Sequence, residues 1–526
     1  MLATVFIPRA FWPMAAVLLL VLAAVQITSA WRESETWDEA GDLVAGYSYL
    51  STGDYRLNPE HPPLAKLLGA LPLVALGLEF PVDQTAWRTG DIRNLGRAFL
   101  YRNRVWAETI LFSARAVTIL LTLVLGALLA WWTRKEFGPA AALAALLLLA
   151  FDPNLIAHGR YVTSDLMVTL LIFAACLAWH DYLIGESSRA LLASGLLAGA
   201  AGMTKFSALF LLPLFVLLYL LRPARFEVRH FLKSLAVVGL LVAACVAAAY
   251  APELIHRPAE FSLVRGLAEL RNKNTAGHNA YLLGSFSMRG WWYYFPVVFA
   301  VKSTTAVVFM TVAGIFLLAR ASWRRVPFRW IATLVPAAVY FALCVASHIN
   351  LGVRHLLPIY PFLYVALGAA AASFARTRTR RLLLGLVLAL HVAESAAIYP
   401  HYLAFFNLLA GGPTRGPRYL LDSNIDWGQD VKELKAYLQR HQLQNVCTCY
   451  FGNADFAWYH MPGRYLSPTI GEQELEQIDC VAAISVTPLY GLYLPRDTFR
   501  SLRSRTPMAR VGYSIYLYDL RKHPAP

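Results

Sequence analysis

Charged residues are scarce in this 526-residue sequence: they make up 15% of it, against roughly 25% in typical soluble proteins. Hydrophobic residues account for 58%, and the mean hydropathy is +0.48. Such a balance excludes an ordinary soluble globular protein and favours a chain that crosses a membrane several times.

Nucleotide-binding motifs are absent as well. The sequence has no Walker-type phosphate loop and no dinucleotide fingerprint. The formal net charge is +15, but no nucleic-acid recognition motif accompanies it. Most of the excess Arg and Lys lies in short stretches between apolar runs, as expected for cytoplasmic loops of a membrane protein. We therefore expect no nucleic-acid partner.

Cysteine is also rare, and three of the six cysteines fall in apolar runs, where a thiol usually acts as a small apolar filler. The other three lie near the C-terminus. Cys447 and Cys449 would share one face of a strand, so either could form a disulfide with Cys480. No second cysteine pair or histidine pair accompanies them, so the sequence disfavours a zinc site, and we assign no metal ligands.

Hydrophobic stretches of about 17–25 residues, long enough to cross a bilayer, recur over the first four-fifths of the chain. This pattern predicts a polytopic α-helical membrane protein with about eleven spans. We expect them at residues 11–30, 109–132, 139–156, 164–184, 190–204, 206–221, 234–251, 293–318, 330–347, 356–374 and 382–399.

Basic residues mark every second connection between these runs, for example at 134–135, 222–233, 320–329 and 376–381. By the positive-inside rule these connections are cytoplasmic. The long segments then lie outside, namely 31–108, 252–292 and 400–526.

The first outer segment is too long for a plain connection. It contains two amphipathic stretches, Glu39–Leu50 and Pro63–Leu78, which we expect to lie along the membrane interface.

After Tyr399 the pattern becomes that of a small α/β domain. Asp430–Leu443 reads as an amphipathic helix, and 446–450, 481–486 and 513–518 read as short strands. We therefore predict a transmembrane domain over 1–399 and an extracytoplasmic α/β domain over 400–526.

Several cations lie inside or beside the apolar runs, where a charge is costly and is a functional candidate. Arg115 lies in the second expected span, Lys302 in the eighth, and Lys205 between the fifth and sixth. Arg354 and His355 precede the tenth. The predicted topology puts all of them near the outer leaflet, where they could hold the phosphate of an anionic, lipid-linked substrate. Arg115 and Lys302 could instead pair with a carboxylate or reach the interface.

Carboxylates accompany these cations, and one of them could act as a general base on an acceptor hydroxyl. Asp38 is the first choice because it closely follows the first span. Its neighbour Glu39 is an alternative, since only one of the two can face a cavity from a helix. Asp165 is a second alternative, which could also orient the acceptor or pair with Arg160.

The motifs together resemble the protein O-mannosyltransferase family and its bacterial relatives that use polyprenyl-phosphate sugars, including the aminoarabinose transferases of lipid A. The resemblance begins with Trp37-Asp38-Glu39 and Glu60-His61-Pro62-Pro63-Leu64-Ala65-Lys66. It continues through Arg115, Phe151-Asp152-Pro153-Asn154 with Asp165, Met203-Thr204-Lys205, Tyr281-Leu282-Leu283-Gly284, Tyr294-Phe295-Pro296 with Lys302, and Gly352-Val353-Arg354-His355-Leu356-Leu357-Pro358. The segment Asp422–Asp430 is similar to one that follows the last span in bacterial members.

This resemblance implies an inverting transferase of the membrane-embedded C-type fold, whose donor is a sugar on dolichyl or undecaprenyl phosphate. It implies that Asp38 is the base or positions the acceptor, and that Arg115 contributes to donor binding. No cofactor is required, although a divalent metal is possible. His61 stands where the aminoarabinose enzymes carry Lys, which favours a mannosyltransferase-like branch. The trefoil domain of the eukaryotic members is absent, which disfavours eukaryotic-type protein mannosylation.

We therefore expect sugar transfer to a protein, lipid or glycan acceptor at the outer face of the plasma membrane. The alternatives are a transporter or flippase for a lipid-linked or anionic solute, which usually shows repeated halves that this sequence lacks, and a scaffold protein. For donor phosphate binding we expect Arg115, Lys205, Lys302, Arg354 and His355. For other substrate contacts we expect Glu60, His61, Lys66, Arg160, Asp165, His348, Asp422, Asp426 and Trp427. For the residues before the Asp430 helix, capping of that helix is the competing explanation.

Overall fold

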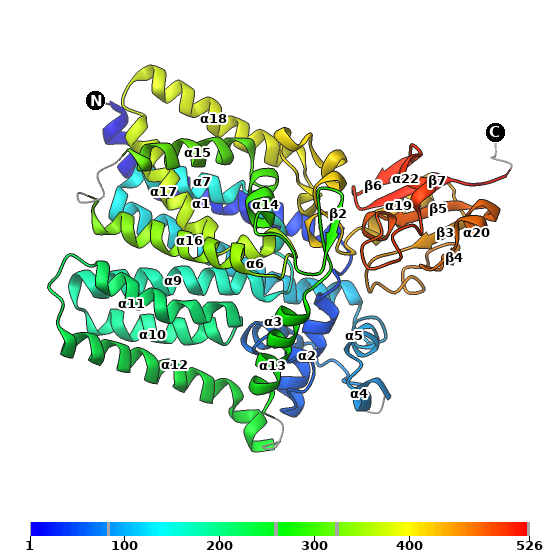
Figure 1. The fold of residues 1–526 in the computed structure, drawn as a ribbon, viewed down its shortest axis with the longest axis horizontal. Coiled ribbons are helices and arrows are strands. Elements are labelled where there is room, and N and C mark those ends of the chain that lie inside the picture. The colour runs from blue at the N-terminus through cyan, green and yellow to red at the C-terminus, as the bar shows by residue number, and fades with distance from the viewer. Residues whose placement is uncertain (1, 82–84, 257–260, 321–325, 523–526) are drawn as a thin grey trace.

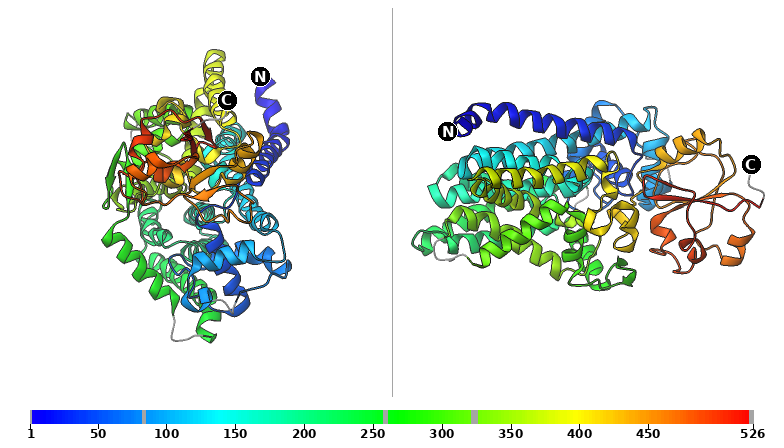
Figure 2. Two further views of the ribbon diagram at one scale, coloured as in Figure 1. Left: turned by 90° about the vertical axis from the view of Figure 1, so that its right-hand side faces the viewer. Right: turned by 90° about the horizontal axis from the view of Figure 1, so that it is seen from above.

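The computed structural model of the protein describes residues 2–81, 85–256, 261–320 and 326–522, with side chains from residue 10 onward. Part of the basic 320–329 connection therefore lies outside the described residues. The chain forms a long helical bundle with a smaller, sheet-containing lobe at one end (Figure 1). The first helix runs along the bundle and ends beside that lobe (Figure 2).

Each predicted span is helical in the structure. Nine of the eleven correspond to one main helix each: α1 (Leu2–Arg32), α6 (Ala107–Phe137), α9 (Ser164–Gly185), α10 (Ser188–Gly202), α11 (Leu211–Leu221, preceded by the 3-10 turn Phe206–Phe210), α12 (Val228–His256), α16 (Phe328–Ala346), α17 (Ile359–Phe374) and α18 (Arg378–Ala397).

The other two expected spans are each divided into two helices. Residues 139–156 form α7 (Pro139–Ala150) and α8 (Pro153–His158), and 293–318 form α14 (Tyr294–Lys302) and α15 (Thr305–Ala319). The first break follows from Asp152, whose carboxylate accepts the Leu155 N–H at 2.7 Å and caps a new helix that begins with proline.

Five of the described helices are long and apolar enough to cross a membrane by themselves: Ala10–Arg32, Ala107–Phe137, Ser164–Gly185, Val228–His256 and Phe328–Ala346. Five shorter apolar helices accompany them, so the number of crossings stays a prediction. Within α9, 72% of the apolar stretch is buried, against 11% in α12. α9 is therefore the central helix, whereas α12 presents its apolar side chains outward.

Small residues let neighbouring helices approach closely, as is usual in membrane bundles. A Cβ added at Gly368 of α17 would come within 2.5 Å of the Ala141 carbonyl oxygen of α7. A larger side chain there would push these two helices apart.

The first outer segment folds into α2 (Glu39–Thr52), α3 (Leu64–Ala75), α4 (Thr85–Thr89) and α5 (Ile92–Tyr101). Their inner faces form a core of their own around Leu43, Val44 and Leu73. A fifth helix, α13 (Ser262–Ala276), lies against this group, and a short hairpin follows it, β1 (Ala280–Leu282) and β2 (Ser285–Ser287).

The C-terminal lobe comprises residues 431–522. Its sheet has the order β4-β3-β5-β7-β6, in which β3 is parallel to β4 and β5 while β7 is antiparallel to β5 and β6. Cys447 and Cys480 form a disulfide, and Cys449 is a buried free thiol. The elements are α19 (Val431–Arg440), β3 (Val446–Cys449), β4 (Arg464–Tyr465), α20 (Glu472–Gln477), β5 (Val481–Ser485), α21 (Val486–Leu489), α22 (Arg500–Arg503), β6 (Ala509–Val511) and β7 (Ile515–Asp519).

Candidate active site

A chain of four charged side chains lies where the bundle meets the C-terminal lobe. Nη1 of Arg354 is 2.9 Å from Oδ2 of Asp38 and 3.9 Å from Oδ2 of Asp165. Nζ of Lys205 lies 2.5 Å from Oδ1 of Asp165. These four residues, here called the Asp38 cluster, come from four segments far apart in the sequence.

Each member of the Asp38 cluster lies at the boundary of a helix. Asp38 immediately precedes α2, Asp165 is in the first turn of α9, and Lys205 follows α10. Arg354 lies in the 3-10 turn Val353–Leu356. Carboxylates are favoured at helix N-termini by the helix dipole. The Asp38 side chain is 36% exposed, whereas that of Asp165 is 2% exposed, so Asp38 is the carboxylate of this cluster that opens to solvent.

Glu39, in contrast to Asp38, is fully buried. Its carboxylate accepts hydrogen bonds from the Thr36 backbone at 2.8 Å and from the Val162 backbone at 3.1 Å. It also accepts two hydrogen bonds from the Arg115 guanidinium. Burial alone would raise the pKa of Glu39, but Arg115 and these donors lower it below the usual value. Glu39 is therefore a permanently charged internal anchor.

Arg115 and Arg160 lie in a second buried layer. Besides Glu39, Arg115 donates to the carbonyl oxygens of Ala30 and Ser34, both at 2.8 Å. Arg160 pairs with Glu33, at 3.0 Å from Nε to Oε2, and not with Asp165. Both arginines are at most 1% exposed, so their guanidinium groups make contacts within the protein.

Lys302 has its hydrogen-bond partners outside the Asp38 cluster. Its ammonium is fully buried and donates to the backbone carbonyls of Leu403 at 2.9 Å and Asn424 at 2.6 Å. Of the Arg and Lys side chains expected at the donor phosphate, the structure brings together Lys205 and Arg354, while Arg115 and Lys302 each donate to buried backbone carbonyls. His348 is exposed, and no hydrogen bond or ion pair from it occurs within the described part of the chain.

A cavity of about 10 Å³, roughly the space for one water, adjoins the Asp38 cluster. Asp42, His61 and Lys66 line it. Lys66 donates to the carbonyl oxygens of Asn58 at 2.5 Å and His61 at 2.7 Å. Its burial lowers the pKa of Lys66 to about 8. Burial also lowers the pKa of His61 to about 3, with Lys205 adding to the effect, so His61 is a neutral ring.

Asp42 was not among the predicted site residues. It lies one helical turn after Asp38 on α2, a spacing that puts both carboxylates on one face. Burial raises the pKa of Asp42 to about 7, against the opposing charge of Lys66. Next to His61 in the sequence, Glu60 forms an ion pair with Lys273 on α13, at 2.5 Å from Oε2 to Nζ. His355 is half-buried and stacks on Phe295, with ring centroids 6.4 Å apart.

The Asp422–Asp430 segment adjoins the Asp38 cluster, since the Arg354 guanidinium lies over the Trp427 ring. Asp422 accepts a hydrogen bond from the Tyr493 hydroxyl, and its charge helps to raise the pKa of Arg354. Asp426 is fully buried, accepts the Thr487 N–H at 3.0 Å, and has its pKa raised by burial to about 8. Asp426 is therefore closed off from solvent, and the substrate contact expected of it stays a prediction.

Trp427 is buried too, and the Arg354 guanidinium lies 4.6 Å above its ring. The helix-capping explanation fails at Asp430, whose side chain caps no backbone N–H of α19. Instead its Oδ2 accepts hydrogen bonds from Gln429 and from Ser514. Trp427 and Asp430 therefore contribute contacts at the junction between the bundle and the lobe.

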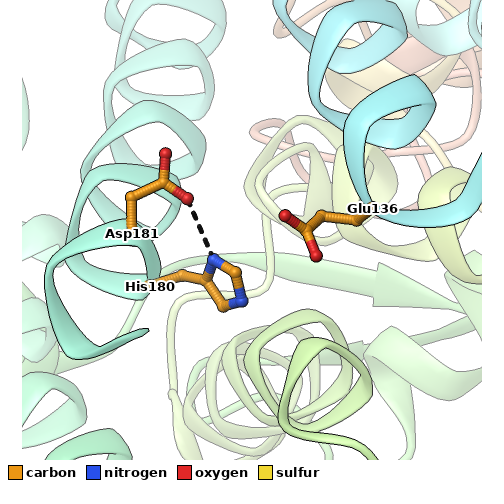
Figure 3. A group of neighbouring side chains, drawn as sticks. All are labelled: Glu136, His180 and Asp181. Carbon is orange, nitrogen blue, oxygen red and sulfur yellow. Dashed lines mark hydrogen bonds and ion pairs between the residues drawn. The ribbon is translucent and has the colours of Figure 1, made fainter. Parts of the chain in front are cut away.

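Among the described residues, one group could hold a metal ion: Glu136, His180 and Asp181, whose ligand atoms lie within 4.8 Å of one another (Figure 3). The Lys135 ammonium is 2.8 Å from both Asp181 oxygens and balances the charge of that carboxylate. At a rise of 1.5 Å per residue, Asp181 lies about 24 Å further along α9 than Asp165. An ion in this group would not contact the Asp38 cluster.

Residues 107–252 match the family model of the dolichyl-phosphate-mannose-protein mannosyltransferases. No curated protein matches the sequence. The fold is similar to crystal structures of ArnT from Cupriavidus metallidurans. The structure with undecaprenyl phosphate bound has a TM-score of 0.51 and 12% identity, covering 98% of this chain and 100% of that one. The apo structure has a TM-score of 0.51 and 14% identity, covering 95% and 97%.

These matches confirm the resemblance found in the sequence and the predicted fold class. The chain shares the helical fold of the ArnT structures, and five of its described helices are long and apolar enough to cross a membrane.

Proposed function

We propose that this protein, with its C-type glycosyltransferase fold, transfers a sugar from a polyprenyl-phosphate carrier to an acceptor hydroxyl with inversion. The observation that carries the proposal is a partly exposed carboxylate, Asp38, paired with Arg354 where the bundle meets the lobe. The family match over residues 107–252 and the undecaprenyl phosphate bound to the similar ArnT structure support the donor class.

The proposed reaction is one displacement. The acceptor oxygen forms a bond to the anomeric carbon while the bond from that carbon to the carrier phosphate breaks, and the phosphate keeps the electron pair. Asp38 takes the proton of the acceptor hydroxyl. Arg354 and Lys205 stabilise the negative charge that develops on the leaving phosphate. Attack opposite the leaving group inverts the anomeric centre.

The Asp38 cluster has an unused hydrogen-bond donor group that could bind that phosphate. Of the Arg354 guanidinium, Nη1 contacts Asp38, while Nε is buried and has no hydrogen-bond partner in the described structure. A buried N–H without a partner is costly. A phosphate oxygen or a water held at the phosphate would satisfy it.

Among the three carboxylates considered for the base, Asp38 fits best. Glu39 is enclosed by its donors, and Asp165 is buried against Lys205. Although its side chain is 36% exposed, partial desolvation by its neighbours raises the pKa of Asp38 above its ordinary value, and Arg354 opposes this. A raised pKa brings a carboxylate closer to the working pH, which makes it a more effective base.

We also propose that the site faces the extracytoplasmic side of the plasma membrane. The basic pair Arg134 and Lys135 ends α6, and the Arg134 guanidinium lies 4.8 Å from the ring centroid of Phe11 in α1. The N-terminal end of α1 is the end away from the lobe (Figure 2). The positive-inside rule would put that end in the cytoplasm and the Asp38 cluster outside.

The test uses membranes containing the full-length protein and a polyprenyl-phosphate mannose or aminoarabinose labelled in the sugar. We expect label to pass from carrier to envelope acceptors, and Asp38→Asn to reduce that rate by about 10²–10⁴-fold, as for loss of a general base. The matched control is Asp497→Asn, because Asp497 is 77% exposed in the lobe. Wild-type protein that moves no label, or Asp38→Asn at wild-type rate, overturns the proposal.

A further inference from the structure

The Asp422–Asp430 segment is bonded on one side to the residues that lead to Asp38. The Ser34 N–H donates to the Gln429 carbonyl oxygen at 2.9 Å, and the Ser34 hydroxyl donates to that of Gly428 at 2.9 Å. The Trp37 N–H donates to the Trp427 carbonyl oxygen at 2.8 Å. Residues 34–37 are thus aligned along 427–429, and the next residue is Asp38.

On its other side the same segment is bonded to the residues that lead to Arg354. The Ser423 hydroxyl donates to the Leu351 carbonyl oxygen at 2.9 Å. The Val353 N–H donates to Oδ1 of Asn424 at 3.0 Å. Gly352 has a φ of +133°, and a Cβ there would lie 2.6 Å from the Asn424 amide. Only glycine permits this contact.

The C-terminal lobe adds a third attachment, directly at Trp37. Nδ2 of Asn453 donates to the Trp37 carbonyl oxygen at 2.7 Å. The Phe451 ring stacks on the Trp37 indole, with centroids 4.8 Å apart and planes 19° apart. Tyr493 stacks on the other face of Phe451 at 5.7 Å. The residue before Asp38 is therefore held by the lobe through both its backbone and its side chain.

We propose that residues 422–430, together with Asn453 and Phe451, form a splint that sets the position of Asp38 relative to Arg354. The C-terminal lobe is then part of the apparatus that positions the base. This inference rests on the proposed function and deepens it, because it names the residues that act through Asp38 without touching the donor.

Asp38 needs such support because little else holds it. Its side chain caps no N–H of α2, and its one ion pair among the described residues is with Arg354. Arg354 itself rests on Trp427 of the splint. A displacement of 1 Å between reacting groups can reduce a rate by about 10²-fold, so both partners must be held by the same rigid support.

The kinetic test compares Asn453→Ala and Asn424→Ala with wild type in the full-length protein. We expect kcat to fall by about 10-fold or more in both variants. In Asn453→Ala the KM for the donor should change by less than about 2-fold, because Asn453 contacts the residue before Asp38 and not the segment that holds Arg354. Asn445→Ala is the matched control, since Nδ2 of Asn445 also donates to a carbonyl oxygen, that of Asp479 at 2.7 Å, elsewhere in the lobe.

Phe451 provides a rescue experiment. Phe451→Leu removes the stack on Trp37 and should lower kcat in the same way. Phe451→Tyr preserves an aromatic face and should keep kcat at the wild-type value. A merely structural role would instead change the yield of folded protein, with kcat per folded molecule unchanged. Wild-type kcat in Asn453→Ala and Asn424→Ala overturns the splint.

Backbone amide exchange separates failure of the splint from failure of the proposed function, because it requires no sugar transfer. Asn453→Ala should raise the exchange rate of residues 34–38, and Asn445→Ala should not. Unchanged exchange in Asn453→Ala overturns the splint even if the wild type is active. A wild type that transfers no sugar overturns the proposed function, while the exchange result still decides on the splint.

Discussion

Glu39 and Arg115 are joined by two hydrogen bonds in a place without solvent, Nε to Oε1 at 2.8 Å and Nη2 to Oε2 at 2.6 Å. The pair links the start of α2 to the interior of α6. It thereby separates the roles of two neighbouring carboxylates, because Glu39 anchors the helix while Asp38 remains open.

Removing one partner of this pair should destabilise the protein strongly. Glu39→Gln leaves the buried Arg115 charge without its counter-ion, and breaking a buried pair in this way costs about 3–5 kcal/mol. We expect a clear drop in Tm of the detergent-solubilised protein. Glu433→Gln is the control, since Glu433 pairs with Arg440 at the exposed surface of α19 and should leave Tm nearly unchanged. A Tm in Glu39→Gln equal to that of the control would contradict the anchoring role.

Loss of Lys205 should reduce donor binding. Lys205→Met alone leaves Asp165 buried and unpaired, so the informative variant is Lys205→Met with Asp165→Asn, which removes both charges. We expect the double variant to fold, with a KM for the donor raised by about 10-fold, equivalent to about 1.4 kcal/mol. Transfer assays at varied donor concentration measure this, and an unchanged KM and kcat would remove Lys205 from the phosphate site.

Lys302 should affect stability but not donor affinity. Lys302→Met removes the donor for two buried carbonyl oxygens, those of Leu403 and Asn424, and unsatisfied buried acceptors cost about 1–3 kcal/mol each. The expected result is a lower Tm with an unchanged donor KM in the fraction that remains folded. A raised donor KM at wild-type Tm would restore Lys302 to the donor site.

The buried Asp426 should make stability depend on pH. Burial raises its pKa to about 8, whereas the unfolded chain has the ordinary value of about 4. Between these two values the folded state binds more protons, so the contribution of Asp426 to stability is fully present below about pH 4 and is lost as pH rises towards 8.

Asp426→Asn replaces a protonated acid by an amide that can still accept the Thr487 N–H. We expect its Tm to fall less than that of wild type between pH 5 and 8, and the difference between the two proteins isolates Asp426 from the other buried acids. Parallel pH curves would show that Asp426 does not change its proton binding on folding. Circular dichroism melts of the full-length protein measure both curves.

The positions of the helices follow from local sequence, because a run of apolar residues in a bilayer must satisfy its own backbone hydrogen bonds. The breaks at Asp152 and Ser303–Thr304 lie inside two of these runs, which hydropathy alone joined into single spans. Three of the five strands of the lobe's sheet were likewise predictable from short β-rich segments, since β3, β5 and β7 fall where those segments are, whereas β4 and β6 were not predicted.

The sequence by itself also determined which charged residues are functional candidates, since each lies in or beside an apolar run where water is scarce. Only the tertiary structure decided what each charge contacts. Arg115 reaches Glu39, which lies 76 residues earlier, and Lys302 reaches Asn424, which lies 122 residues later. Ion pairs and hydrogen bonds act over about 3 Å, so they depend on which helix ends the folded bundle brings together, and no local pattern of residues encodes that.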